Sequence, residues 1–309
     1  MKLIHAANEL GNGSRKVCLA IGVFDGVHLG HQQIIRQTVS DAHQHDALAV
    51  VVTFDRHPHA VVAPERVPPQ IYAHAQKTRA IAALGVEAVL EIHFDRAFSE
   101  KTGELFVREL LRDLGKIHSI CVGADFVFGH RRTGNVALLK VLGAELHFQV
   151  HGLAAVALDG QVVSSTRIRE MIRTGNFDAA SQMLGRPYAI SGRVVEGDRL
   201  GRQWGFPTAN LDAAGLILPP NGVYSAVTQV KGQTYRVALN IGVRPTLAAP
   251  QPQLRVEAHL LDFSGDLYGS ELELELGQKL RDEQRFASPD ELRRQIERDV
   301  AAVRAAGAE

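Results

Sequence analysis

The hydrophobic pattern of this chain changes its period near residue 186, and that change limits the folds the chain can adopt. Before this point, apolar runs of strand length alternate with stretches of helical spacing. After it, short alternating segments are separated by turn residues such as Asn221 and Gly222. We therefore predict two domains, residues 1–185 and residues 186–309. A chain of 309 residues is long enough for each domain to bury its own core.

The first half alternates predicted strands with predicted helices. We expect strands at residues 17–24, 48–54, 88–94 and 117–122, and helices at residues 31–43, 76–84 and 102–114. This βαβα order is typical of a parallel sheet covered by helices on both faces, so we predict a Rossmann-like α/β domain. Ligands of such folds bind at the carboxyl ends of the strands.

The second half consists of short predicted strands and a final helix. The strands are expected at residues 188–195, 223–230, 234–241, 254–263 and 271–280. Their number and spacing predict a small closed antiparallel β-barrel. The helix begins after Ser288, which we expect to cap it, with Glu291 completing a capping box. Its apolar stripe is expected to pack on the barrel and consists of Leu292, Ile296, Val300 and Val303.

Charge and composition narrow the partners. Lys and Arg together number 34, as do Asp and Glu, so no overall field attracts nucleic acid or an anionic membrane. A local cluster, Arg167–Arg173, can still bind a small polyanion. Residues 1–10 lack the apolar core of a signal peptide, and no apolar run is long enough to span a bilayer. Cys18 and Cys121 lie in apolar runs and are expected to be buried, reduced thiols. We expect a cytoplasmic protein, for which a weak homo-oligomer stays an open alternative.

The first chemical motif is G-V-F-D-G-V-H-L-G-H at Gly22–His31, where the first long strand ends. A strand that turns through glycines into a helix presents backbone N–H groups and a positive dipole end to an anion. Imidazole N–H groups of His28 and His31 can stabilise charge that develops on a phosphoryl group. A zinc pair would need a third ligand, which is not evident. Two unrelated histidines are the other alternative in a chain with 14 of them.

The second chemical motif is G-R-Q-W-G-F-P-T-A-N at Gly201–Asn210. Its glycines can wrap phosphates at a barrel edge. Thr208 and Asn210 are two residues apart and therefore lie on one side of an extended chain. Their oxygens are ligands that Mg²⁺ accepts beside nucleotide phosphates. A plain turn before a strand is the alternative. The two motifs lie about one domain length apart, which predicts two separate nucleotide sites.

Several segments together resemble one enzyme family. The first motif, with Thr53–Pro58, Gly123–Gly129 and Ser164–Arg169, is similar to the nucleotidylyltransferase module of bacterial bifunctional riboflavin kinase/FAD synthetases. This resemblance implies that hydroxyls and a cation hold the ATP phosphates. The implied phosphate-site residues are Gly22, Phe24, Asp25, Gly26, Gly30, Ser165, Thr166 and Arg169, and the implied flavin and nucleotide pocket includes Gly123 and Asp125. Taken alone, Ser165 and Thr166 would be an ordinary helix cap.

The same resemblance extends over the second half. G-x-x-x-G-R-x-x-G-F-P-T-A-N-L is similar to the flavokinase signature of this family, and residues 240–246 and 256–269 match as well. The resemblance implies magnesium ligands at Thr208 and Asn210 and a general base at Glu257. It also implies an ATP-binding set made of Gly192, Gly197, Gly201 and Gly205. On its own, Glu257 would be an exposed strand carboxylate.

The implied activity is a pair of ATP-dependent transfers. Riboflavin and ATP would give FMN and ADP at the barrel, and FMN and ATP would give FAD and pyrophosphate at the α/β domain. A class I aminoacyl-tRNA synthetase shares an H-x-G-H loop but would also carry an anticodon-reading domain and a basic surface. A flavin sensor without chemistry is the non-enzymatic rival, and the presence of His28, His31, Thr208, Asn210 and Glu257 speaks against it.

Overall fold

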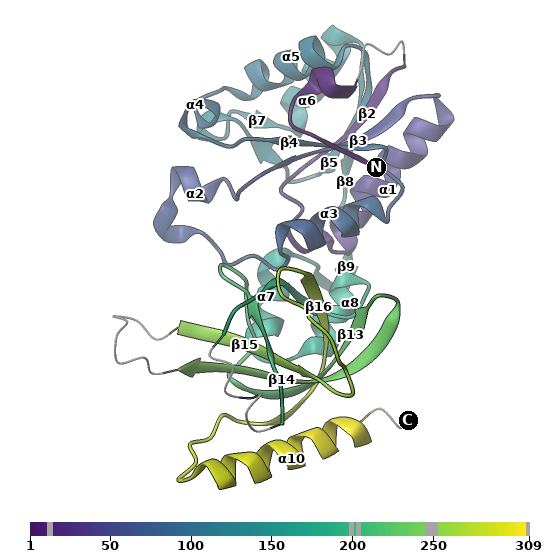
Figure 1. The fold of residues 1–309 in the computed structure, drawn as a ribbon. Coiled ribbons are helices and arrows are strands. Elements are labelled where there is room, and N and C mark those ends of the chain that lie inside the picture. The colour runs from purple at the N-terminus through teal and green to yellow at the C-terminus, as the bar shows by residue number, and fades with distance from the viewer. Residues whose placement is uncertain (11–14, 198–200, 202–204, 245–252, 307–309) are drawn as a thin grey trace. The chain divides into compact units, whose positions relative to one another are not determined.

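The computed structural model describes residues 1–10, 15–197, 201, 205–244 and 253–306 (Figure 1). They form two compact units. The first unit comprises Met1–Pro69 and His74–Ser165, and the second comprises Gln70–Ala73 and Thr166–Glu309. The segment from residue 166 to residue 185 thus groups with the second unit. The boundary at residues 185 and 186 stays a prediction.

The first unit is built on one parallel sheet of six strands in the order β1-β4-β3-β2-β5-β8. The strands are β1 Lys2–Ile4, β2 Val17–Ile21, β3 Leu48–Phe54, β4 Ala88–Ile92, β5 Ile117–Gly123 and β8 Gln149–Leu153. The chain leaves β2 toward β3 on one side, whereas β5 lies on the other side of β2. The crevice of such a sheet lies at the carboxyl ends of the strands where the order reverses, here β2 and β5.

Helices cover both faces of this sheet, as predicted. The helices of the unit are α1 Leu29–Gln44, α2 His59–Val62, α3 His74–Ala82, α4 Arg96–Ser99, α5 Gly103–Leu114 and α6 Val136–Leu146. Alternate residues of β2 enter two different cores: Cys18 and Ala20 join one with Ile35 of α1. Leu19 and Ile21 join the other, with side chains of α5 and α6. The smaller strands are β6 Val127–Phe128, β7 Gly134–Asn135, β9 Ala157–Leu158 and β10 Gln161–Val162.

Two expectations for this unit need correction. The strand expected to reach residue 24 ends at Ile21, because Phe24 adopts a left-handed backbone conformation with φ of 54°. The helix expected from residue 31 begins at Leu29, because the His28 side chain caps it by accepting a bond from the His31 backbone N–H. The three-residue edge strand β1, the edge strand β8 and the helix α6 were not predicted.

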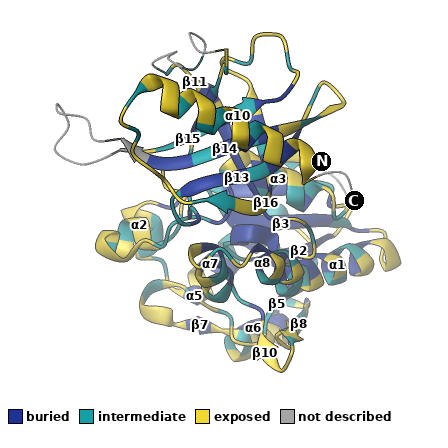
Figure 2. Ribbon diagram, turned by 90° about the horizontal axis from the view of Figure 1, so that it is seen from below, coloured by how far each residue is buried: buried dark blue, intermediate teal, exposed yellow. Residues whose placement is uncertain are grey.

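The second unit contains a closed barrel of six antiparallel strands in the order β11-β12-β15-β14-β13-β16. They are β11 Ala189–Val195, β12 Ala209–Asp212, β13 Gly222–Val230, β14 Gln233–Arg244, β15 Gln253–Leu260 and β16 Glu271–Arg281. Alternate residues fill the interior, so the strands show buried positions in Figure 2. The predicted barrel is confirmed, and the short strand β12 is its unpredicted member.

Helices precede and follow the barrel strands in the sequence. α7 Ser165–Arg173 and α8 Phe177–Leu184 precede it, and the Phe177 ring packs against Tyr188 and Tyr224 with centroids 5.9 and 5.7 Å away. The last helix, α10 Pro289–Ala305, packs on β13 and β14. Its outer side is exposed (Figure 2), whereas Val303 of the predicted stripe is buried.

The start of α10 differs in one detail from the expected capping box. Ser288 Oγ accepts from the Glu291 backbone N–H at 3.2 Å, so the cap is confirmed. The Glu291 carboxylate, however, accepts from the backbone N–H of Ala287 at 3.1 Å, one residue before the cap. The Glu291 carboxylate therefore accepts from the residue before the cap, whereas in a capping box it accepts from the cap residue itself.

Both cysteines are free and buried, as expected. Burial raises the pKa of the Cys121 thiol to about 12, which makes it an unreactive core residue. Within the part of the chain that the structure describes, no helix is both long and apolar enough to cross a membrane.

Candidate active sites

The loop Gly22–Val27 that follows β2 has a rare backbone conformation. Phe24, Gly26 and Val27 all have positive φ angles, of 54°, 76° and 41°, while Asp25 between them does not. Left-handed backbone at a residue other than glycine costs about 1–3 kcal/mol and persists only where the surroundings hold it. Alternation of left- and right-handed residues turns successive N–H groups into an anion-binding concavity. The loop conformation is therefore the kind that suits phosphate.

Side chains from three other segments hold this loop by its carbonyl groups. The hydrogen bonds run from Thr53 Oγ1 to Val23 O (3.1 Å), from Ser165 Oγ to Asp25 O (3.1 Å) and from Gln32 Nε2 to Val27 O (2.9 Å). They engage every second carbonyl of the loop. Because these carbonyl oxygens face protein donors, they do not repel an anion bound at the N–H groups. The predicted residue Ser165 thus contacts the loop although it lies 140 residues from Asp25 in sequence.

The two motif histidines lie directly against one another. Their rings stack with centroids 3.6 Å apart and an interplanar angle of 20°. His28 is only 6% exposed, and its Nδ1 accepts from the His31 backbone N–H at 3.4 Å. In a neutral His28 this leaves the ring proton on Nε2. The Phe24 ring packs edge-on against His31 at 5.2 Å.

The environment keeps His31 uncharged. Burial lowers the pKa of His31 well below its ordinary value of 6.5, and the neighbouring His28 lowers it further. Among the described residues, His31 Nδ1 has no hydrogen-bond partner although it is buried. A buried polar atom at an anion-binding loop fits a site whose remaining partner is a bound ligand.

The other predicted residues of this site divide between the two units. Gly22 and Gly30 lie against Phe24 and His28: an added Cβ would stand 3.0 Å from the Phe24 ring and 3.3 Å from the His28 ring. Gly123 ends β5 beside β2, with exposed Asp125 just beyond it. Thr166 and Arg169 lie on α7 in the second unit, where Arg169 is buried, so their roles stay as the resemblance implies them.

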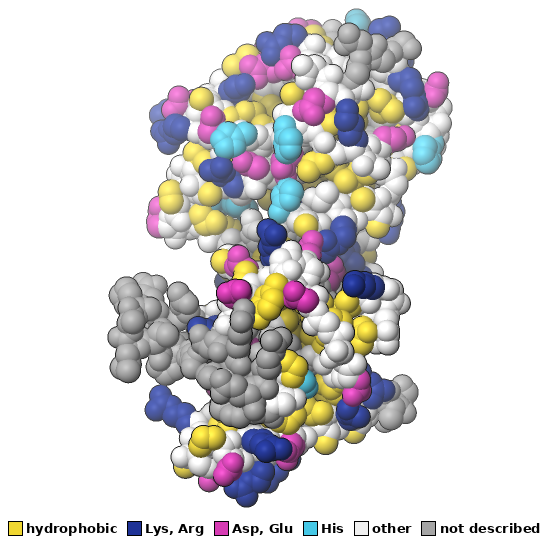
Figure 3. Space-filling view, in the orientation of Figure 1, with side chains coloured by type: hydrophobic (Ala, Val, Ile, Leu, Met, Phe, Trp, Pro, Cys, Tyr) yellow, Lys and Arg dark blue, Asp and Glu magenta, His cyan; other side chains and the backbone are white. Residues whose placement is uncertain are grey.

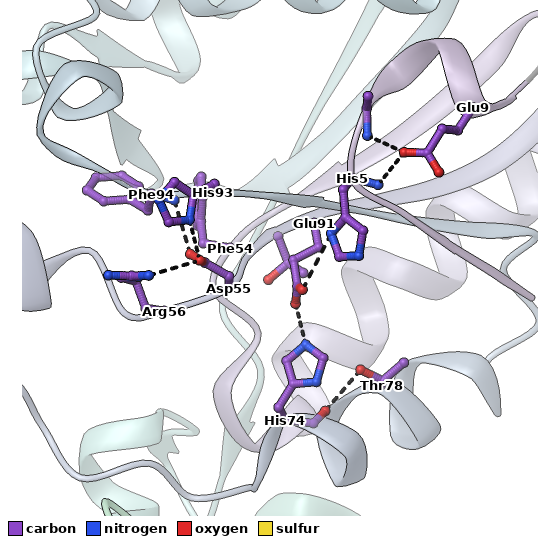
Figure 4. A network of polar contacts seen from close by, with 12 residues as sticks. His5, Glu9, Phe54, Asp55, Arg56, His74, Thr78, Glu91, His93 and Phe94 are labelled. Atoms are coloured by element: carbon purple, nitrogen blue, oxygen red, sulfur yellow. Dashed lines mark hydrogen bonds and ion pairs between the residues drawn. The ribbon is translucent and has the colours of Figure 1, made fainter.

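A polar network that the sequence did not reveal lies at the ends of β3 and β4 (Figure 4). Asp55 accepts from His93 Nδ1 at 2.7 Å and from the Phe94 backbone N–H at 3.0 Å. Burial would raise the pKa of Asp55, but these bonds and the nearby Arg56 lower it below its ordinary value. Asp55 and Arg56 both lie in the segment Thr53–Pro58, which carries part of the resemblance.

The second part of this network surrounds a buried carboxylate. Glu91 of β4 is 6% exposed, bonds His74 Nε2 and lies 3.9 Å from His5 Nδ1. Histidine and acidic side chains gather on this face of the unit (Figure 3). In the sequence, this buried carboxylate is marked only by an acidic residue within the apolar run A-V-L-E-I. Among the described residues, no three or more His, Cys, Asp or Glu side chains are arranged to hold a metal ion.

In the barrel, regular strand pairing brings the second set of predicted residues together. Asn210 of β12 lies directly opposite Glu257 of β15. On the other side, Asn240 of β14 lies opposite the same Glu257. Their sequence neighbours, such as Leu211 and Val256, are buried in the barrel, so this row faces outward. Thr208 precedes β12 by one residue and by alternation faces the same side as Asn210.

The row offers oxygen and amide groups around one carboxylate. Asn210, Asn240 and Glu257 are all half-buried, and Arg255 Nη1 lies 4.0 Å from Glu257 Oε1. Sequence reasoning noted the segment that contains Asn240 but gave that residue no role. The only sequence feature that pointed to Asn240 was the match of its segment to the family. The position of Asn240 beside Glu257 follows from the strand register.

Three of the four predicted glycines of the barrel site, Gly192, Gly197 and Gly201, have neighbours too close for a side chain. A Cβ on Gly197 would stand 2.2 Å from Asn210 Nδ2, so this glycine makes room for the Asn210 amide. Cβ atoms on Gly192 and Gly201 would stand 2.4 and 2.3 Å from backbone carbonyl oxygens. Gly205 has a φ of 86°. Residues 202–204 of the motif lie outside the described residues.

The two units together define a two-domain, nucleotide-dependent transferase, and comparison with known proteins gives its family. The family model described as FAD synthetase matches residues 12–167, and that described as riboflavin kinase matches residues 184–306. The chain belongs to the family of bifunctional riboflavin kinases/FMN adenylyltransferases. The resemblance inferred from the motifs is confirmed, and the chain is a riboflavin kinase and FMN adenylyltransferase with both domains in the expected order.

Individual relatives match over nearly their whole length. The bifunctional riboflavin kinase/FMN adenylyltransferase of Escherichia coli (strain K12) is 38% identical over 306 residues, which is 98% of this chain and 97% of that protein. The protein of the same name from Pseudomonas fluorescens is 39% identical over 308 residues, 100% of this chain and 98% of that protein. A crystal structure named macrolide-efflux protein from Streptococcus pneumoniae is 28% identical, with a TM-score of 0.81, covering 98% of this chain and 99% of that one.

Proposed function

We propose that the two reactions occur at the two sites described above, one in each unit. The observation that carries the assignment of adenylyl transfer is the loop Gly22–Val27, whose carbonyls are held by protein donors and whose neighbouring histidines are stacked. The row of Asn210, Glu257 and Asn240 on the barrel is the site of riboflavin phosphorylation. The residues 185 and 186 are the proposed limits of the two functional domains.

At the first site, a phosphate oxygen of FMN attacks the α-phosphorus of ATP. A new P–O bond forms as the bond to the β-phosphate bridging oxygen breaks, and pyrophosphate leaves with its electrons. The attacking oxygen is already ionised, so no proton has to be removed. The N–H groups of residues 23–26 and the amino-terminal end of α1 stabilise the negative charge, whereas those of Gly22 and Val27 donate to Val52 O and Phe24 O. The His28 Nε2–H and a ring N–H of neutral His31 donate to phosphate oxygens.

At the second site, the riboflavin 5′-hydroxyl attacks the γ-phosphorus of ATP and ADP leaves. Glu257 accepts the hydroxyl proton, and Asn240 orients that carboxylate from the neighbouring strand. Thr208 and Asn210 supply the kind of oxygen ligands that Mg²⁺ takes beside nucleotide phosphates. When bound, Mg²⁺ neutralises phosphate charge. The donor set fits an ion held by few protein groups and mainly by the nucleotide.

The experiment that tests this proposal follows the flavins over time. Purified protein is incubated with riboflavin, ATP and Mg²⁺, and riboflavin, FMN and FAD are separated at intervals. FMN should appear first and FAD afterwards, and FAD should form from supplied FMN without any riboflavin present. The site assignment is then tested by His28→Ala and Glu257→Gln, each of which should stop one step alone. A variant that stops both steps while folded would contradict separate sites.

A further inference from the structure

Lys77 on α3 is a half-buried cation beside the loop Gly22–Val27, and neither the motifs nor the reaction explains it. Its Nζ donates to the Phe54 carbonyl oxygen at 3.2 Å and to Thr53 Oγ1 at 3.4 Å. α3 itself packs against the 3₁₀ turn Asp25–Val27 of the loop. A lysine loses much solvation on burial, so its position here needs a reason.

Electrostatic surroundings show what holds this cation in place. Burial lowers the pKa of Lys77, and the carboxylates of Glu91, Asp25 and Asp55 counteract that effect. Glu91 is already bonded to His74, one turn earlier on the same helix. Among the described residues, Lys77 has no direct ion pair, so its hydrogens go to Thr53 and Phe54.

Thr53 links this lysine to the loop. The hydroxyl is fully buried, and its single proton is donated to the Val23 carbonyl at 3.1 Å. A hydroxyl that donates in one direction still accepts in another, and Lys77 occupies that acceptor side. A donor on that side favours the orientation of the hydroxyl in which its proton points at Val23, the residue directly before left-handed Phe24.

We propose that Lys77 is a positioning residue for adenylyl transfer: through Thr53 Oγ1 it holds the Gly22–Val27 loop in its anion-binding conformation. The inference rests on the proposed function, which places that reaction at this loop. Without the ammonium, the Thr53 hydroxyl is free to rotate toward another carbonyl, and the Val23 carbonyl is released. Residues 24–27 then relax from their positive φ angles, and the N–H groups no longer converge on the phosphates.

The first test is Lys77→Met in the full-length protein, with FMN and ATP as substrates. We expect kcat for FAD formation to fall about tenfold, the effect of losing roughly one directed hydrogen bond. Phosphorylation of riboflavin by the same preparation should stay unchanged. Lys77→Arg, which keeps the charge and the donors, should recover part of the loss. Lys140→Met removes a lysine from the exposed side of α6 and serves as the matched control.

A double-mutant cycle with Thr53→Val decides whether Lys77 acts through the hydroxyl. Valine keeps the shape of threonine and replaces the hydroxyl with a methyl group, so Thr53→Val should reduce FAD formation about as much as Lys77→Met, and Thr53→Ser should not. If Lys77 works through Thr53, the double variant should be no slower than the single ones, because coupled residues are not additive. Losses that multiply would overturn the proposal, since Lys77 would then act on its own.

Failure of the inference can be told apart from failure of the proposed site. If His28→Ala leaves FAD formation intact, the site assignment itself is wrong. If His28→Ala stops it but Lys77→Met has no effect, only the role of Lys77 is refuted. Should Lys77→Met fail to fold, as judged by its melting curve, Thr53→Val against Thr53→Ser still tests the link. Equal rates for those two variants would refute it.

Discussion

The two sites of this enzyme are built in opposite ways. The adenylyltransferase loop consists of irregular backbone with positive φ angles, held by bonds from Gln32, Thr53 and Ser165. The kinase row uses ordinary strand pairing, in which Asn210, Glu257 and Asn240 are neighbours by register. We propose that both serve nucleotide phosphates. The difference then teaches that a nucleotide site can be built either on irregular backbone or on the side chains of a regular sheet.

Each construction predicts a different sensitivity to mutation. A regular row should lose function when a group that contacts substrate or Mg²⁺, or the neighbour that orients it, is changed, and should tolerate substitution elsewhere. A strained loop should also lose function through residues that never contact substrate. The predictions below test this comparison, from the largest expected effect to the smallest.

The largest effect is expected for the kinase carboxylate. Glu257→Gln keeps the size and half-buried position of the side chain but cannot take the proton of the riboflavin hydroxyl. FMN formation should fall by at least about a hundredfold, since general base catalysis contributes on the order of 10²–10⁴. Supplied FMN should still be converted to FAD. Glu275→Gln, on the exposed side of β16, is the control. Normal FMN formation by Glu257→Gln would show that this row is not the kinase site.

The histidine pair should give the complementary loss. His28→Ala or His31→Ala should slow FAD formation from FMN by about 10²–10³, because each removes a preorganised donor to the phosphates. Riboflavin phosphorylation should continue at the normal rate. His43→Ala lies on the exposed face of the same helix α1 and should change neither reaction. Wild-type FAD formation by either variant would remove that histidine from the mechanism.

A smaller effect concerns the limits of the barrel domain. A fragment of residues 186–309 should fold and phosphorylate riboflavin, but a fragment of residues 166–309 should melt about 10 °C higher. The longer fragment retains Phe177, which packs on Tyr188 and Tyr224, and Ser181, whose Oγ accepts from the Tyr188 N–H at 3.0 Å.

Circular dichroism gives the melting temperature of each fragment. Separation of the flavin products shows whether each fragment phosphorylates riboflavin. Phe177→Ala in the longer fragment is the matched control and should remove most of the difference in melting temperature. A folded but inactive fragment 186–309 would show that residues before 186 contribute to the kinase site. Equal melting temperatures would place the boundary of the barrel domain where the sequence predicts it.

The smallest expected effect concerns how the stability of the first unit, which contains His31, depends on pH. Because the pKa of His31 is lowered in the folded protein, the unfolded chain binds a proton that the folded chain does not as pH falls below about 6.5. His31 therefore stabilises the fold fully above that pH and progressively less as acidity increases toward its folded pKa. His31→Phe should make the fall in melting temperature between pH 7 and pH 5 shallower by a few degrees. His43→Phe should leave the slope unchanged, and a steeper slope in His31→Phe would contradict the assignment.

The comparison also explains which parts of the molecule the sequence could predict. Strand β3 matches its predicted range because a continuous apolar run of that length is a local signal. The alternation in Ala209–Asp212 spans only four residues, which is too few to predict strand β12. The end of β2 was placed too late because Phe24 is apolar, and apolar character alone does not reveal a left-handed turn.

The residues of the two sites also divide into those that a local sequence motif predicts and those that only long-range packing brings into place. Thr208, Asn210 and Glu257 could be named from motifs, since each lies within a specific stretch of sequence. The cross-strand pairing of Asn240 with Glu257 depends on barrel register, and the contact between Lys77 and Thr53 depends on how α3 covers β3. Such contacts arise from packing between segments far apart in the chain, for which one sequence carries no local signal.

The pairing of β11 with β16 also governs how the protein is made. These are the first and the last strands of the barrel, and they close it by pairing Ala189 with Glu275. Until residue 281 has left the ribosome, β11 and β13, the two strands with which β16 pairs, present unpaired edges that can recruit another chain. The parallel sheet has all its strands by residue 153. We expect limited proteolysis of stalled nascent chains to find a protected first unit while the barrel is still digested. A message cut short within the last strand would thus yield a polypeptide that is prone to aggregate through its unfinished half.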